Sequence, residues 1–185
     1  MILTPTQIPG AALVELERFE DERGFFARSF CAREFARAGL PSSFVQCNVS
    51  WSPRRHTLRG MHWQGPPFEE AKLVRCTRGA ILDVIVDVRA GTPAFLRHVA
   101  VRLDEENRRG LLVPPGVAHG FLTLVDRTEV HYQMSAFHAP EQARGARWND
   151  PAFAIDWPAA PEVISERDRS YPDFPRPAPA ARGVA

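Results

Sequence analysis

Short runs of alternating apolar and polar residues dominate the middle of the chain. In residues 98–103 the alternation is strict, which is typical of a β-strand with one buried face. Residues 81–88 carry apolar side chains in both registers, with Asp83 and Asp87 in one of them, and this predicts a strand buried on both faces. Further strands are expected at residues 57–64, 111–113, 121–125 and 129–134.

Turn signals separate these runs at intervals of about ten residues. They are Arg78-Gly79, Ala90-Gly91-Thr92-Pro93, residues 104–110, Pro114-Pro115-Gly116 and Asp126-Arg127. Such regular spacing favours an antiparallel sandwich or barrel over alternating strand–helix units. The most economical all-β architecture is a jelly-roll β-barrel, which encloses a cavity that can hold a ligand.

Helices are expected to be few, short and peripheral. Residues 31–38 are followed by Gly39-Leu40-Pro41, which predicts a short helix with a glycine stop. Ser165 is a suitable cap for a second short turn. We find no internal repeat and expect residues 1–171 to form a single domain. Residues 172–185 are rich in proline and alanine, and we expect them to form a poorly ordered tail.

Composition excludes several classes of protein. The chain has 185 residues, of which 44% are hydrophobic and 24% charged, so it is not wholly disordered and is long enough for one core. The formal net charge is +1, which gives no strong field for nucleic acid or an anionic membrane. No apolar run approaches the length of about 18 residues that spans a bilayer.

The cellular compartment is inferred from the N-terminus and the cysteines. The N-terminus lacks a basic segment followed by an apolar stretch, so we expect no secretory signal. Cys31, Cys47 and Cys76 are odd in number, widely spaced and without a CxxC motif. These features favour reduced thiols in a cytoplasm over a disulfide framework or a thiolate zinc site.

Three single residues are candidates for chemistry. Lys72 is the only lysine, whereas the other 22 basic residues are arginine, and it lies in a strand-like run. His62 lies in the expected strand 57–64, where Gly60 marks a candidate bulge that would change which side chains share its face. Tyr132 has the parity of Val130 and Met134, so its ring is expected to face the interior, where its hydroxyl either reacts or bonds a backbone carbonyl.

Anion binding has more support than metal binding. Cationic residues at expected turns or strand ends are Arg23, Arg28, Arg54, Arg55, Arg59 and His119. Arginine suits bidentate phosphate contacts, although exposed ion pairs with the 22 acidic residues would also account for this set. His62 has no HxH partner, and His56 lies in an expected loop, so we expect no metal and no cofactor.

Seven ordered segments resemble a known family, the dTDP-4-dehydrorhamnose 3,5-epimerases of the cupin superfamily. The resemblance extends from about residue 10 to about residue 172, in the family's order and spacing, and the ordered set is highly specific. The segments are Asp21-Glu22-Arg23-Gly24-Phe25-Phe26, Gln46-x-Asn48-x-Ser50, residues 58–64, Lys72-Leu73-Val74-Arg75, residues 83–89, residues 115–121 and Trp148-Asn149-Asp150-Pro151.

The resemblance implies a homodimeric, metal-free epimerase that removes a proton next to a 4-ketone of a nucleotide-diphosphate sugar and returns one to the opposite face. The family's base matches His62, its orienting carboxylate Asp168 and its acid Tyr132. Lys72 matches the cation beside the ketone oxygen, and Asp83 matches an acid lining the same pocket. Positions implied to hold the substrate are Arg23, Phe26, Gln46, Asn48, Arg59, His119 and His138, with part of each nucleotide site supplied by the other chain.

The chain departs from the family pattern near the substrate. Arg28 stands where family members often carry a glutamate near the nucleoside, Phe137 and His138 replace a tyrosine pair, and Ala143 replaces a glutamate. These changes leave the expected base, acid and lysine in place. They keep open an epimerase that acts on one carbon or on another nucleotide, and, in other classes, a cupin that only binds a sugar nucleotide or a metal-dependent oxygenase.

Overall fold

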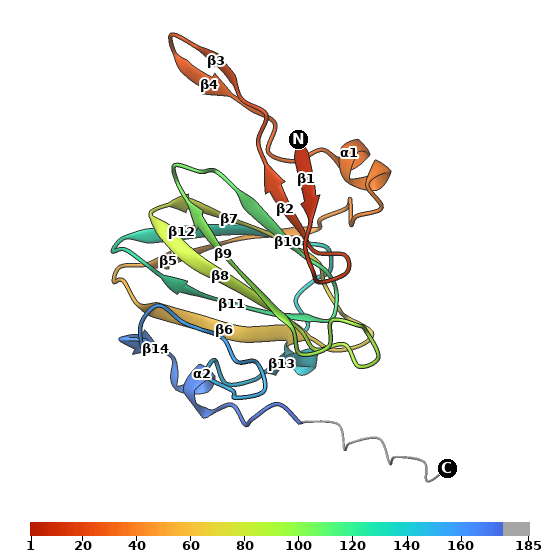
Figure 1. Ribbon diagram of the computed structural model, residues 1–185, viewed down its shortest axis with the longest axis vertical. Helices are drawn as coiled ribbons and strands as arrows, with labels where there is room; N and C mark the ends of the chain where they lie inside the picture. The colour runs from red at the N-terminus through yellow and green to blue at the C-terminus, as the bar shows by residue number, and fades with distance from the viewer. Residues whose placement is uncertain (176–185) are drawn as a thin grey trace.

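The computed structural model describes residues 1–175, which fold into two packed β-sheets with short peripheral helices (Figure 1). One sheet has the strand order β1-β2-β10-β7-β12-β5, and the other has the order β13-β6-β11-β8-β9, with β14 parallel to β6. The first sheet contains β1 (Ile2–Pro5), β2 (Ala12–Glu15), β5 (Gln46–Ser52), β7 (Lys72–Arg78), β10 (Gly110–Val113) and β12 (Thr128–Met134). The second contains β6 (Thr57–Gln64), β8 (Ala80–Asp87), β9 (His98–Asp104), β11 (Val117–Thr123), β13 (Ala143–Gly145) and β14 (Val163–Ile164). The predicted all-β jelly-roll barrel is confirmed.

The remaining elements lie at the periphery. Strands β3 (Phe19–Asp21) and β4 (Gly24–Phe26) form a two-stranded hairpin that projects away from both sheets (Figure 1). Helix α1 (Ala32–Arg37), the 3-10 turn η1 (Pro140–Gln142) and helix α2 (Glu166–Ser170) are short, as expected. Among residues 1–175, no helix is both long enough and apolar enough to cross a membrane.

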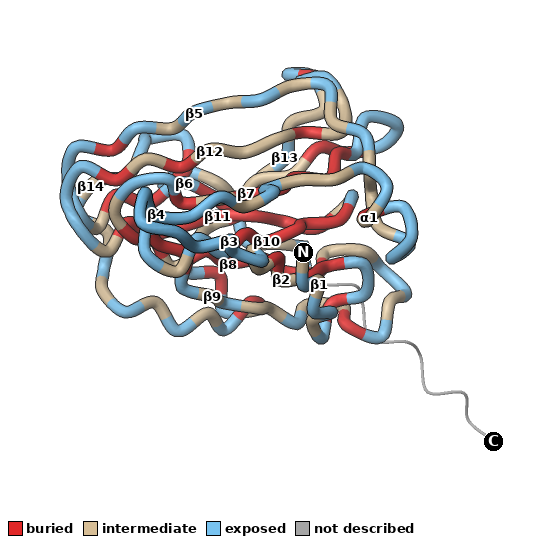
Figure 2. The backbone as a smooth tube through the Cα atoms, turned by 90° about the horizontal axis from the view of Figure 1, so that it is seen from above, coloured by how far each residue is buried: buried red, intermediate tan, exposed pale blue. Residues whose placement is uncertain are grey.

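The main core lies between the two sheets. Val74 and Leu111 of the first sheet and Ile85 and Leu103 of the second are fully enclosed in one cluster. Figure 2 shows that buried positions continue along β8 and β11, and every residue of β11 is buried. Full burial of an aliphatic side chain stabilises the fold by about 1.5–3 kcal/mol, so the residues packed along β8 and β11 contribute strongly to the stability of the fold.

Most of the expected strands form within a residue or two of their predicted bounds, but β11 is an exception. The sequence placed a turn at Pro114-Pro115-Gly116 and began the strand only at Phe121, whereas the strand begins at Val117 and ends at Thr123. The segment contains a glycine and a histidine, which are not typical strand residues, so the sequence did not predict that β11 pairs with β8 along its whole length. His119 therefore belongs to a central strand and not to a loop.

The C-terminal contacts extend beyond residue 171, where we expected the domain to end. The ring of Phe174 packs on Phe153, with ring centroids 5.6 Å apart, and its backbone N–H donates to the Asp150 carboxylate. Asp173 pairs with Arg147. The first residues of the expected tail (172–185) therefore contact the domain. Residues 176–185 lie outside the described part.

Candidate active site

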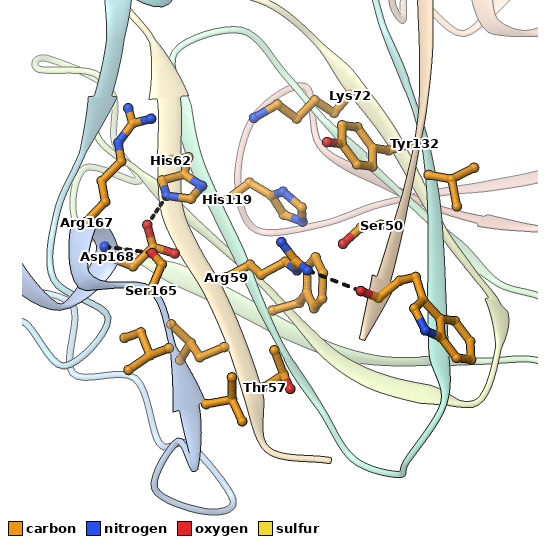
Figure 3. Close-up of a pocket in the computed structure, with 16 residues that line it drawn as sticks. Ser50, Thr57, Arg59, His62, Lys72, His119, Tyr132, Ser165, Arg167 and Asp168 are labelled. Atoms are coloured by element: carbon orange, nitrogen blue, oxygen red, sulfur yellow. Dashed lines mark hydrogen bonds and ion pairs between the residues drawn. The ribbon is translucent and has the colours of Figure 1, made fainter. Parts of the chain in front are cut away.

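A cavity of about 700 Å³ opens between the two sheets and helix α2. Its polar lining includes Arg59 and His62 of β6, Lys72 of β7, His119 of β11 and Tyr132 of β12, together with Asp168 of α2. In Figure 3, His62 and Tyr132 lie on opposite sides of this pocket, with Lys72 and His119 between them. The structure therefore brings together residues that are far apart in the sequence.

A second cavity of about 540 Å³ adjoins the first one. His62, Lys72, Tyr132 and Arg167 line both cavities, so the two form one continuous cleft. Sites for drug-sized ligands have volumes of about 300–1,000 Å³, so the cleft is large enough to hold a nucleotide-sized ligand.

His62 and Asp168 form a close pair at one wall of the pocket. The distance from His62 Nε2 to Asp168 Oδ1 is 2.7 Å, and the carboxylate side chain is only 6% exposed, whereas the imidazole is 39% exposed. Asp168 also accepts a hydrogen bond from the Gly60 N–H. With Nε2 held by the carboxylate, the other ring nitrogen faces the pocket with a free lone pair, which is the arrangement of a general base (Figure 3).

Helix α2 fixes the carboxylate in place. Ser165 caps the helix as predicted, and its hydroxyl accepts a hydrogen bond from the Asp168 N–H at 3.1 Å. Burial by itself raises the pKa of Asp168, but the hydrogen bond and charge interaction with His62, together with hydrogen bonds from the Gly60 N–H and from Ser165, outweigh it, so the pKa lies below its ordinary value. The carboxylate is therefore ionised beside the imidazole at neutral pH.

The bulge that the sequence suggested at Gly60 is present. The register between β6 and β11 shifts between His119 and Phe121, opposite Gly60. Gly60 has a φ of +130°, and a Cβ there would lie 2.5 Å from the Gly120 Cα, so only glycine fits. Strict alternation would have turned Arg59 and His62 to opposite faces, but after the bulge both line the pocket.

Lys72 lies at the start of β7, almost fully buried. Its Nζ forms an ion pair with Glu70 Oε1 at 3.0 Å, and the two side chains are 10% and 3% exposed. A cation fixed in a cavity from which water is excluded can stabilise a developing oxyanion. The sequence pointed to Lys72 through its rarity, but it gave no sign of Glu70, which follows another glutamate in an apparent loop.

Tyr132 faces the interior, as its parity with Val130 and Met134 predicted. Desolvation by burial raises the pKa of the phenol, nearby Arg59 lowers it, and Glu70 raises it further, with a net shift above the ordinary value of 10.0. The hydroxyl is therefore protonated at neutral pH. No hydrogen bond from this hydroxyl to a described residue is present, so the group is available to donate a proton to a ligand.

Asp83 does not line the cavity, in contrast to the expectation. Its side chain is fully buried on β8, behind His119, and Oδ1 lies 2.7 Å from His119 Nε2. The carboxylate therefore acts on the pocket through the orientation of His119, because the imidazole separates the two. This is a second aspartate–histidine pair in the same site, and it is more deeply buried than the first.

The other expected substrate residues fall into two groups. Gln46, Asn48 and His138 line the second cavity, where Gln46 Oε1 accepts a hydrogen bond from the His138 N–H at 2.6 Å. Arg23 and Phe26 lie on the projecting β3–β4 hairpin, with the Arg23 side chain 84% exposed and paired to Asp21. The single chain does not bring these two residues to the cleft.

Several lining residues were missed by the sequence analysis. Besides Glu70, they include Arg144 of β13, Arg167 of α2 and Ser50 of β5, whose buried hydroxyl has no partner among the described residues. Arg167 is adjacent to Asp168, and Ser50 continues the spacing of Gln46 and Asn48, so both could have been found from their neighbours. Among residues 1–175, no three His, Cys, Asp or Glu side chains gather as a metal site would require.

Comparison with known proteins identifies the family. A sequence model of the family described as dTDP-4-dehydrorhamnose 3,5-epimerase matches residues 5–176. The chain belongs to this family. The predicted family and the predicted class of enzyme, an epimerase, are thereby confirmed.

Individual relatives agree with this assignment. The dTDP-4-dehydrorhamnose 3,5-epimerase of Pseudomonas aeruginosa is 46% identical over 177 residues, covering 94% of this chain and 96% of the relative. The crystal structure of the Bacillus anthracis enzyme with TDP and PPi bound is 40% identical and superimposes with a TM-score of 0.90, covering 94% of this chain and 99% of that one. A 3'-monoepimerase from Streptomyces bikiniensis in complex with dTDP-quinovose is 35% identical, with a TM-score of 0.85, covering 92% and 86% of the two chains.

Proposed function

We propose that this family member epimerises a dTDP-linked 4-keto-6-deoxyhexose at C3 and C5, without a metal, and that His62, Tyr132 and Lys72 carry the reaction. The observation that supports this most strongly is the cavity itself. An imidazole oriented by a buried carboxylate faces a protonated phenol across the pocket, and the only lysine of the chain lies beside them.

The chemistry follows from the acidity of carbon atoms next to a ketone. His62 takes the proton from C3 or C5, and the electrons of the broken C–H bond form a C=C bond while the ketone becomes an enolate. The ammonium of Lys72 stabilises the negative charge on that oxygen. Tyr132 then donates its proton to the same carbon from the opposite face, the ketone re-forms, and the imidazolium and the phenolate exchange protons with water.

The substrate's charged end fits the remaining residues of the cleft. Arg59 and His119 lie beside the base, and Arg167 lies where the two cavities join, so these groups are suited to a diphosphate. Gln46, Asn48 and His138 of the second cavity offer donors and acceptors to a nucleoside. We assign them to nucleotide binding, as the resemblance implied.

We also propose a homodimer in which the β3–β4 hairpin of one chain completes the site of the other. Phe26 is 72% exposed, and the only partner of the Arg23 side chain among residues 1–175 is the neighbouring Asp21 carboxylate, so both are free to meet a nucleotide on a second copy. Mixing His62→Ala chains with Arg23→Ala chains tests this, because a hybrid dimer contains one site with both native residues. Recovery of activity on subunit exchange is expected, and exchange without recovery would contradict the shared site.

A reducing compartment, the cytoplasm, is the setting that we infer for this enzyme. Cys31, Cys47 and Cys76 are all free thiols in the described part of the chain. Metal independence is tested by prolonged treatment with a chelator followed by elemental analysis, which should leave the turnover unchanged. A loss of activity that added metal restores would favour the metal-dependent alternative.

A single-carbon epimerase is the second candidate. The related 3'-monoepimerase favours it over unrelated activities, as do the departures from the family pattern at His138 and Ala143, which line the second cavity, and at the adjacent Phe137. Incubation with a dTDP-4-keto-6-deoxyglucose in D₂O separates the candidates. Deuterium at both C3 and C5 is expected, label at one carbon would select the second candidate, and label at neither carbon would favour a protein that only binds the nucleotide sugar.

A further inference from the structure

A buried glutamate beside the catalytic cleft has no role in the chemistry described so far. Glu70 lies two residues before Lys72, lines the second cavity and is 5% exposed as a residue. Charged carboxylates are almost never buried to this extent unless they are paired. Its neighbour Glu69 is exposed, so burial is specific to one of the two adjacent glutamates.

The only partner of Glu70 in the described part of the chain is the ammonium of Lys72. Oε1 lies 3.0 Å from Nζ, whereas Oε2 is buried and has no hydrogen-bond donor among residues 1–175. For Lys72, this ion pair is likewise the only polar contact within that range. An ammonium has three N–H donors, and its ion pair with Glu70 leaves donors available to a ligand.

The backbone between the two residues is fixed. The Ala71 N–H donates to Ser135 Oγ at 2.8 Å, and the Ser135 N–H donates to the Ala71 carbonyl at 3.0 Å. Ala71 itself is fully buried. Glu70 and Lys72 are therefore attached to a rigid peptide on the same side of the chain, which makes the carboxylate a fixed anchor for the long and otherwise flexible lysine side chain.

We propose that Glu70 is a positioning residue for the epimerisation, holding the ammonium of Lys72 where it meets the ketone oxygen of the substrate. This inference rests on the proposed role of Lys72. Glu70 does not act on the substrate itself, since its free oxygen is not accessible from the cleft. Its contribution is orientation, and the carboxylate also balances the charge of an ammonium that is largely removed from water.

Glu70→Gln tests the proposal, with Glu69→Gln as the matched control. The amide keeps the size of the side chain but not the charge that holds Nζ. Because a displacement of about 1 Å in a catalytic group can cost about 10²-fold, we expect the kcat for deuterium incorporation to fall by about 10- to 100-fold. KM should change far less, and the exposed Glu69→Gln should match the wild type in both. A wild-type kcat in Glu70→Gln would overturn the proposal.

A double-mutant comparison separates positioning from a merely structural role. If Glu70 acts through Lys72, Glu70→Gln should cause no further loss of kcat in a Lys72→Met background. Lys72→Met leaves Glu70 buried and unpaired, so the double variant should also melt at a higher temperature than Lys72→Met alone. Independent losses that multiply in the double variant would contradict the proposal.

The phenol of Tyr132 gives a spectroscopic readout of the same carboxylate. The charged and titratable groups that surround this pocket are Arg59, His62, Glu70, Lys72, His119, His138, Arg144, Arg167 and Asp168. Glu70 helps to raise the pKa of Tyr132, so Glu70→Gln should lower that pKa. The chain has two tyrosines, and a Tyr171→Phe background isolates the tyrosinate absorbance of Tyr132. An unchanged titration would mean that the carboxylate is not charged beside the cleft, which contradicts the proposal.

The outcomes distinguish this inference from the function on which it rests. Wild-type turnover in Lys72→Met would refute the role of Lys72 itself, whereas an impaired Lys72→Met with a fully active Glu70→Gln would refute only the role of Glu70. Circular dichroism and thermal melting establish that each variant is folded. Should Glu70→Gln not fold, Glu70→Asp serves instead, because it keeps the charge and retracts the carboxylate by one methylene. A kcat within about threefold of wild type in that variant would overturn the proposal.

Discussion

Replacing Asp168 by asparagine tests the pair on which the proposed base depends. The substitution conserves shape and leaves an oxygen for the Gly60 N–H, but it removes the charge that faces His62 Nε2 at 2.7 Å. An asparagine that turns its amide N–H toward the ring also favours the tautomer protonated on Nδ1, which cannot accept a proton from the substrate. Deuterium exchange at C3 and C5 should therefore slow together, because both carbons use the same base.

The expected size of the effect follows from the contact. A hydrogen bond to a charged group contributes about 1.5–3 kcal/mol, and the low exposure of Asp168 keeps water from replacing it. At about 1.4 kcal/mol per factor of ten, this corresponds to a loss of about 10- to 150-fold in the rate of proton abstraction. The wrong tautomer would deepen the loss.

The assay is the initial rate of deuterium incorporation in D₂O, followed by NMR, with Glu166→Gln as the control. Glu166 is an exposed carboxylate on the same helix, two residues before Asp168, so its replacement changes the net charge by the same amount. We expect the control to match the wild type. A rate for Asp168→Asn within about threefold of wild type would refute the view that the carboxylate activates His62.

The same substitution predicts a dependence of stability on pH. The pKa of Asp168 in the folded protein lies below its ordinary value of 3.8, so the folded state binds this proton less readily than the unfolded state does. The resulting stabilisation is present at neutral pH and is lost as the pH falls through the folded pKa. The difference in melting temperature between wild type and Asp168→Asn should therefore shrink as the pH is lowered below 3.8, the ordinary pKa of the group. A difference that stays constant would contradict the ion pair.

Three further predictions concern single side chains. Tyr132→Phe should lower the rate of epimerisation by about 10²–10⁴-fold, as expected for loss of a general acid, and a wild-type rate in an NMR assay would point to another proton donor. Lys72→Met should reduce kcat more than KM in the same assay, because the charge on the ketone oxygen develops only in the transition state, whereas unchanged turnover would refute that role. Iodoacetamide should label the exposed Cys47 in the folded protein but not Cys76, whose burial raises the pKa of its thiol to about 12, and peptide mapping that finds both labelled at equal rates would contradict this packing.

The sequence predicted the parts of the structure that depend on local periodicity. Strands β9 and β12 follow from alternation of apolar and polar residues, β8 follows from a run that is apolar in both registers, and the cap of α2 follows from a single serine before its first turn. The contact of Asp168 with His62 joins residues 106 positions apart, and no local pattern indicates it. That pair was expected only because ordered segments along the whole chain resembled a family.

What the sequence missed was hidden by long-range packing. Glu70 has the surroundings of a solvated loop residue, with two prolines and another glutamate just before it, and only the three-dimensional structure reveals that it is buried against Lys72. Asp83 was expected in the pocket because the family resemblance implied it, although the intervening ring of His119 separates it from the cavity. Arg23 and Phe26 do not line the cleft of their own chain, and their hairpin projects away from both sheets (Figure 1).

The bulge at Gly60 shows how one local backbone feature can orient three side chains of the site. Gly60 and Gly120 face each other across β6 and β11 so closely that a Cβ on either would collide with the backbone of the other strand. That close approach permits the register shift which turns Arg59 and His62 into the same pocket, and it leaves the Gly60 N–H directed at the Asp168 carboxylate. The imidazole, the arginine and the carboxylate are therefore oriented by the same two glycines. A substitution at Gly60 would disturb proton abstraction and diphosphate binding together, whereas substitutions of the side chains would separate them.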